Sequence, residues 1–134
     1  TATDSTERST TSTSFVTGSN TLSVAITPSS SSNKIYITST FEAGTSDTGN
    51  TSTLYTLYRG STNLSANIQG FSRIYFSGLG GHASQINQSI QILDSPNTTS
   101  ATTYQIYMKG IGGNTLYFNK SGVTGSITAM EIAG

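Results

Sequence analysis

Short runs in which apolar and polar residues alternate are the feature that most restricts how this chain can fold. Leu22, Val24 and Ile26 alternate with Ser23, Ala25 and Thr27 in a stripe that ends at Pro28. A period of two places alternate side chains on opposite faces of a β-strand. Similar runs, separated by segments rich in Gly, Ser, Asn and Pro, occupy residues 34–43, 53–59, 64–68, 71–76, 86–92, 104–109 and 126–133. We therefore expect about eight to ten strands, no long helix, and an all-β antiparallel sandwich or jelly roll.

The 134 residues fit a single domain with one hydrophobic core. Residues 1–13 show no apolar periodicity, so we predict a linker or extended arm there and a head domain over residues 14–134. The chain begins with Thr rather than Met, and we expect it to be a fragment or a processed product.

The composition excludes several classes of function. Only 12 residues are charged, six of each sign, so the basic field of a nucleic-acid-binding protein is absent. The same balance argues against attachment to anionic membranes, and no apolar run is long enough for a transmembrane helix. There is no cysteine, whereas Ser and Thr supply 47 residues. Hydroxyl-rich, weakly charged surfaces of this kind are typical of extracellular β-proteins, and they suit the exposed faces of strands.

Few residues offer catalytic chemistry. The single histidine, His82, lies in a glycine-rich segment with no carboxylate pair near it in sequence. We expect a structural or incidental role, although triad members can come from anywhere in a chain. Glu42 and Asp47 are the only close carboxylate pair of the head domain, and we expect them to be solvated turn residues. A glycoside hydrolase would need two facing carboxylates, and a calcium site several clustered ones. The prediction is a protein that is not an enzyme, with no metal and no cofactor, and a hydrolase as a distant alternative.

Two predicted strands are apolar on both faces, residues 54–58 and 127–132. A two-layer sandwich covers only one face of each sheet, so we expect a second copy of the chain to cover the other, with closed cyclic symmetry. The expected interface residues are Tyr55, Leu57, Ile127, Ala129 and Met130. Tyrosines on the polar faces of strands can stack on sugars, fill a subunit interface or pair with cross-strand neighbours; these are Tyr36, Tyr107 and Tyr117.

Four segments of the chain carry distinctive strand-and-turn motifs. The first, residues 11–43, contains Phe15-Val16 followed by an ITPSSSSNKI turn, and the others are LYRGSTNL (57–64), LDSPNTTSATTYQIYMK (93–109) and SITAMEIAG (126–134). In this order they resemble a module of tailed-bacteriophage tail-fibre and other virion surface proteins, over about 120 residues. The resemblance implies a jelly-roll domain, similar to tumour-necrosis-factor or C1q heads, that forms a homotrimer on a fibre or spike. No catalytic residues come with it.

The resemblance also implies a function at the virion surface. The domain would attach the phage to its host through a bacterial surface polysaccharide or other receptor, and its N-terminal arm would lead from an upstream fibre shaft. Residues 68–85 match no part of the motifs, and recognition residues commonly lie on variable loops of a rigid scaffold. We therefore expect Arg73, Tyr75 and His82 to bind the ligand. The alternative is a purely structural trimerisation or decoration module with no ligand of its own.

Overall fold

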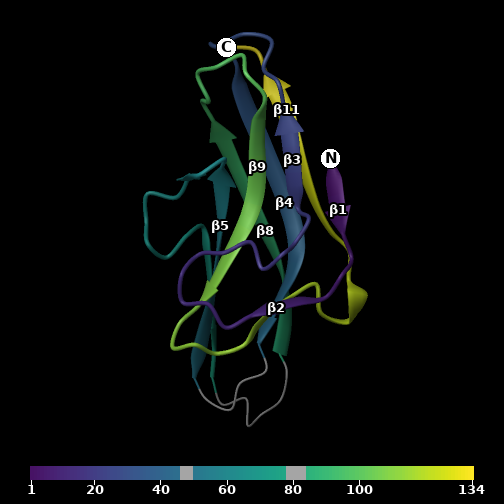
Figure 1. Cartoon of the computed structure of the whole chain (residues 1–134), viewed down its shortest axis with the longest axis vertical. Helices are drawn as coiled ribbons and strands as arrows, with labels where there is room; N and C mark the ends of the chain where they lie inside the picture. The colour runs from purple at the N-terminus through teal and green to yellow at the C-terminus, as the bar shows by residue number, and fades with distance from the viewer. Residues whose placement is uncertain (46–49, 78–83) are drawn as a thin grey trace.

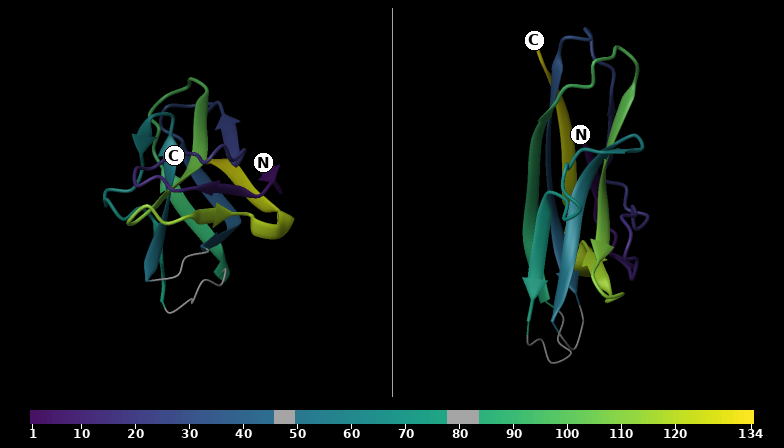
Figure 2. Two further views of the ribbon diagram at one scale, coloured as in Figure 1. Left: turned by 60° about the horizontal axis from the view of Figure 1, so that its bottom comes forward. Right: turned by 90° about the vertical axis from the view of Figure 1, so that its left-hand side faces the viewer.

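A computed structural model of the chain describes residues 1–45, 50–77 and 84–134 (Figure 1). Within these ranges the chain is all-β, with two antiparallel sheets that form a sandwich and one short 3₁₀ turn, η1 (Lys120–Gly122). Figure 2 shows that the long strands run along the long axis of the molecule in two layers. The strands are β1 (Ala2–Asp4), β2 (Arg8–Thr10), β3 (Ser23–Ile26), β4 (Lys34–Thr45), β5 (Thr51–Arg59), β6 (Thr62–Asn63), β7 (Ser72–Phe76), β8 (Ser84–Asp94), β9 (Thr102–Gly110), β10 (Leu116–Phe118) and β11 (Gly125–Ile132).

The six-stranded sheet is built around the long strand β4. Strand β8 pairs with one edge of β4 from Ile35↔Asp94 to Thr45↔Ser84. Along the other edge β11 and β10 follow each other, and they pair in turn with β1 and β2. The five-stranded sheet has the order β3-β9-β5, with β6 and β7 sharing the outer edge of β5.

The alternating stripes of the sequence point into the space between the sheets, as expected. Ile35, Ile37 and Phe41 of β4 are buried there, opposite the inward side chains of β5 and β9. The Phe41 ring lies 5.0 Å from the Tyr55 ring and 4.9 Å from the Phe118 ring, between ring centroids. Period-two alternation therefore identified the buried face of β4 correctly, because a strand covered on one side needs one apolar face.

The predicted strand over residues 64–68 is wrong. Only Thr62 and Asn63 of this region form a strand, β6, and the chain then leaves the edge of β5 and returns at β7. Gly70, with φ +76, makes the return, and the amide of Phe71 donates to the carbonyl of Tyr55. Within residues 64–68, the Asn63 Oδ1 and Ser65 Oγ accept hydrogen bonds from the amides of Ser65 and Asn67. Local side-chain hydrogen bonds of this kind compete with strand pairing, and the apolar residues do not reveal them.

Residues 1–13, which the sequence predicts as a linker or extended arm, contribute β1 and β2 to the six-stranded sheet. The Asp4 carboxylate accepts hydrogen bonds from the amides of Thr6 and Thr21, each 2.9 Å long. Burial disfavours the charged form of Asp4, but these two amides and the Arg8 guanidinium outweigh it and lower the pKa of the carboxyl. Asn119 also donates to the Asp4 carbonyl, so this segment is held in place by contacts with the rest of the domain.

The outward side of β5 is covered by the chain itself rather than by a second copy. Leu54 and Thr56 point away from the core and yet are 1% and 0% exposed. Phe15 lies above them. Its ring contacts Lys109 on β9 and lies next to Gly70 beyond the other edge of β5, so it crosses the outward side of β5. Residues before β3 hold Phe15 there through paired backbone hydrogen bonds between Val16 and Met108.

The expected oligomer interface therefore needs correction. Tyr55, Leu57 and Ile127 are 0% exposed in the core of the single chain and cannot reach a partner. Ala129 is partly buried against the same core, and only Met130, which is 44% exposed, projects to the surface. Alternation along a strand does not distinguish a face covered by the chain's own loops from one covered by another subunit.

Candidate functional site

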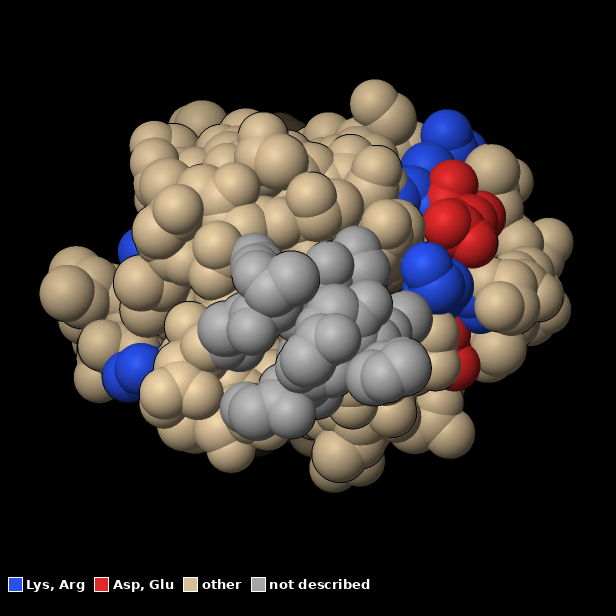
Figure 3. Space-filling model, turned by 90° about the horizontal axis from the view of Figure 1, so that it is seen from below, with Lys and Arg blue, Asp and Glu red and all other residues tan. Residues whose placement is uncertain are grey.

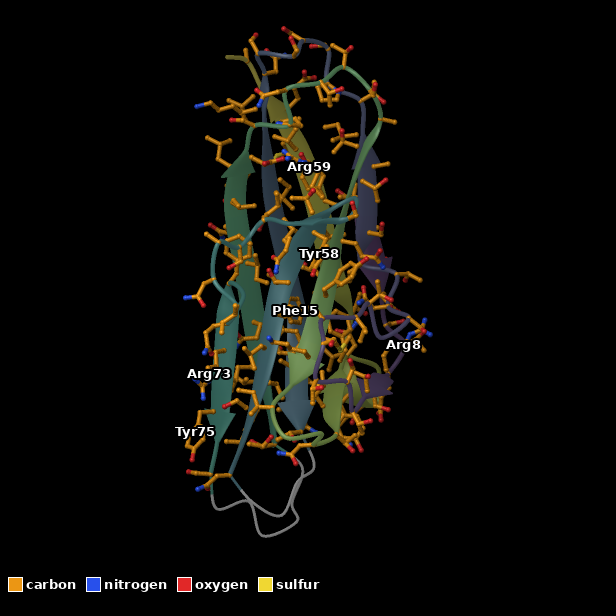
Figure 4. The ribbon with its side chains drawn as sticks, turned by 60° about the vertical axis from the view of Figure 1, so that its left-hand side comes forward. Arg8, Phe15, Tyr58, Arg59, Arg73 and Tyr75 are labelled. Atoms are coloured by element: carbon orange, nitrogen blue, oxygen red, sulfur yellow. The ribbon has the colours of Figure 1, made fainter. Side chains whose placement is uncertain are left out.

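The candidate site lies on the outward face of the five-stranded sheet. Arg73 and Tyr75 stand on β7 in register with Leu54 and Ser52 of β5, and both are exposed, Tyr75 by 58%. Figure 4 shows them one below the other at the edge of the sheet, pointing away from the ribbon. The sequence predicted both residues as ligand-binding, and the structure places them next to each other. His82, the third predicted residue, and Asp47 of the carboxylate pair lie outside the described residues.

The Arg73 guanidinium is held by neutral groups. Its Nε and Nη2 donate to the Ser52 Oγ at 3.2 and 3.1 Å, and its Nη1 donates to the Gln69 Oε1 at 3.2 Å. These bonds fix the plane of the guanidinium, but none of them supplies a negative charge. Among the salt bridges of the described residues, none involves Arg73.

Lys109 occupies the matching position on the other side of β5. Leu54 pairs with Arg73 on β7 and with Lys109 on β9, so the two cationic residues flank it in one row across three strands. Two inter-strand spacings put their backbones about 10 Å apart. The Lys109 Nζ lies 4.5 Å from the centroid of the Phe15 ring, a cation–π contact that orients the ammonium and leaves its charge in place. Sequence reasoning missed Lys109, although its alternation against the buried Tyr104, Ile106 and Met108 already placed it on the outward face.

Aromatic rings continue this face away from the row. Tyr58 of β5 and Tyr107 of β9 are stacked, with centroids 3.9 Å apart and an angle of 19° between the rings. Tyr107 thus pairs with an aromatic residue of the neighbouring strand, which is one of the three roles predicted for it. The other two polar-face tyrosines also contact the chain itself: Tyr36 donates to Gln91, and Lys120 lies over Tyr117.

Asp94 and Glu131 have structural partners and lie elsewhere. Glu42, predicted to be a solvated turn residue, stands within β4, and its Oε1 is buried without a hydrogen-bond partner among the described residues. Asp94 binds Arg59 and Tyr104 between the ends of the two sheets. Glu131 accepts hydrogen bonds from the Asn33 side chain and from the Ser29 amide and hydroxyl, and these bonds lower the pKa of its carboxyl. Seen from below, acidic side chains gather with basic ones on one side of the molecule, whereas on the other side only Lys and Arg are visible (Figure 3).

The outward face of the six-stranded sheet offers a second surface. Met130, Tyr36 and Leu93 stand side by side in register on β11, β4 and β8, and Met130 and Leu93 are 44% and 50% exposed. Farther along the same face is a pocket of about 290 Å³ with no charged group in its walls, which are formed by Thr40, Phe41, Asn87, Gln88, Ser89, Val123 and Thr124. This face therefore combines an exposed apolar row with a neutral pocket.

The described residues place no three His, Cys, Asp or Glu side chains together as a metal site. They also include no helix of sufficient length and apolarity to cross a membrane. Comparison with known proteins returned neither a matching family model nor a matching curated protein.

Proposed function

We propose that the chain is the jelly-roll head of a phage tail fibre or another virion surface protein, and that it attaches to the host through a surface polysaccharide. The proposal is for binding and not for catalysis. It is supported most directly by the outward face of the five-stranded sheet, where Arg73, Tyr75 and Lys109 project from rigid strands. Rigid presentation of aromatic and hydrogen-bonding groups is suited to sugar rings, which have apolar faces and hydroxyl edges.

The strand order supports the jelly-roll part of the proposal. One sheet contains the order β1-β11-β4-β8 and the other β3-β9-β5-β7. In an eight-stranded jelly roll the chain passes repeatedly between two antiparallel sheets of four strands each. The order of these eight strands agrees with that arrangement.

The attachment function is tested with the isolated domain. We expect it to bind host cells, to compete with phage adsorption, and to bind at least one polysaccharide on a glycan array. The variant Tyr75→Ala should weaken all three effects, whereas Ile132→Ala, which removes a side chain of similar exposure from the opposite sheet, should leave them unchanged. A domain that binds no glycan and fails to block adsorption would contradict the proposal.

A structural trimerisation module is the second candidate, and the row Met130–Tyr36–Leu93 favours it. Exposed apolar side chains that stand together on a sheet are typical of subunit contacts. The face around the row is rich in hydroxyls, and Lys34, two residues before Tyr36 on β4, is its nearest charged group. Light scattering should then give about three times the chain mass of 14.0 kDa. Leu93→Glu with Met130→Glu should yield folded monomers, and a wild-type mass of 14.0 kDa would refute the trimer.

A further inference from the structure

We infer that the outward face of the five-stranded sheet selects acidic polysaccharides, whose sugars carry carboxylate or phosphate groups, over neutral ones. This inference rests on the proposed attachment function and specifies its ligand class. The geometry that supports it is the row Arg73–Leu54–Lys109, in which two cations face the same way across three paired strands. Their backbones are about 10 Å apart, a spacing close to the length of a disaccharide, so both side chains are within reach of neighbouring charged units of one polymer.

Neither Arg73 nor Lys109 forms a salt bridge among the described residues, so each can pair with an anionic group of a ligand. Arg73 uses its hydrogen bonds on a hydroxyl and an amide, and Lys109 lies over an aromatic ring. Neutral partners orient a cation without neutralising it, and hydrogen bonds to an anionic acceptor are about twice as strong as neutral ones. The guanidinium also keeps N–H groups beyond those bonded to Ser52 and Gln69, in a fork that matches carboxylate and phosphate oxygens.

Around the row, the residues that the structure describes add no negative charge. The described outward positions of β3, β5, β7 and β9 around it are serine, alanine, threonine, leucine, glutamine and tyrosine. The chain has zero formal net charge, so this excess of positive charge is local, and it acts over roughly a Debye length of 10 Å at moderate salt. Tyr75, in the next row along β7, supplies an exposed aromatic face on which a sugar ring can stack.

Binding of three defined polysaccharides tests the inference. The probes are dextran, which is neutral, polygalacturonate, which carries carboxylates, and a phosphomannan, which carries phosphates, each measured by affinity electrophoresis or interferometry. We expect tighter binding to at least one acidic polymer than to dextran, and a loss of that preference as salt is raised. Comparing polygalacturonate with the phosphomannan shows whether the face prefers carboxylate or phosphate groups.

Variants then assign the preference to the row. Arg73→Gln and Lys109→Gln should each weaken acidic binding about threefold to fivefold, the upper part of the range expected for an exposed charge pair, and together about tenfold to twenty-fivefold. Lys34→Gln removes an equal charge from the exposed start of β4 and should have no effect. Equal binding of dextran and the acidic polymers, or equal losses in Lys34→Gln and the row variants, would overturn the inference.

The failure of this inference is distinguishable from failure of the attachment function. A domain that blocks phage adsorption and binds only neutral polysaccharides keeps the function and loses the acidic selectivity. A domain that neither blocks adsorption nor binds any probe loses both. The salt dependence is measured on the wild-type protein, so this test of acidic selectivity remains valid even where a substitution affects folding.

Discussion

Asp94 joins the two sheets at one end of the sandwich, and its replacement by Ala gives a quantitative test of the fold. At the end of β8, its carboxylate accepts hydrogen bonds from the Arg59 Nη1 at 3.0 and 2.9 Å and from the Tyr104 hydroxyl at 2.7 Å. Both donors belong to the five-stranded sheet. Burial raises the pKa of Tyr104, and the hydrogen bond to Asp94 raises it further, so the phenol remains a donor well above neutral pH.

The magnitude follows from the burial of the two donors. Tyr104 is 0% exposed, and a buried hydroxyl left without an acceptor costs about 1–3 kcal/mol. Arg59 is 28% exposed in its side chain, so water replaces the carboxylate and the lost ion pair costs at most about 1 kcal/mol. We therefore expect Asp94→Ala to lower the free energy of unfolding by about 2–3 kcal/mol, or the melting temperature by about 7–10 °C for a chain of this length.

Urea unfolding of Asp94→Ala, Tyr104→Phe and the double variant measures these contributions. Tyr104→Phe removes the buried hydroxyl with its hydrogen bond and should cost about 1 kcal/mol. In the Tyr104→Phe background, Asp94→Ala no longer strands a hydroxyl and should cost about 1 kcal/mol or less. A loss below about 0.5 kcal/mol for Asp94→Ala, or strictly additive losses in the double variant, would refute the assignment of Asp94 as the link between the sheets.

Three further predictions concern other parts of the domain. The pKa of Asp4 is lower in the folded than in the unfolded state, so the ionised carboxylate stabilises the fold above the unfolded value of about 3.9, and this stabilisation is lost as pH falls through the folded pKa. Between pH 6 and pH 2 the urea midpoint should therefore fall more steeply for the wild type than for Asp4→Asn. Gly70→Ala should cost more than about 2 kcal/mol in thermal unfolding, because φ is +76 and the added Cβ meets the Tyr55 carbonyl; a neutral result would show that the turn relaxes. Ile127→Ala should cost about 2–4 kcal/mol in urea, and Met130→Ala under about 1 kcal/mol when measured on the monomer; equal losses would contradict the assignment of one to the core and the other to the surface.

Part of the candidate site follows from local spacing alone. Arg73 and Tyr75 are two residues apart in a predicted strand, so they share a face whatever the rest of the chain does. Lys109 lies 36 positions after Arg73, and only the pairing of β5 with both β7 and β9 brings the two into one row. A single strand contains no information about its neighbours in the sheet, so this pairing was not predictable from the sequence.

The sequence by itself determined the long strands and their buried sides, because alternation of apolar and polar residues is a local property that backbone geometry converts directly into two faces. Ile35, Ile37 and Phe41 are the clearest example. What covers a second apolar face was decided only by tertiary structure. Phe15, distant in sequence, crosses the outward side of β5, where the sequence predicts another subunit. Residues 1–13 pair with β10 and β11. Both contacts depend on long-range strand pairing, whose energy comes from many small contributions that no short stretch of sequence displays.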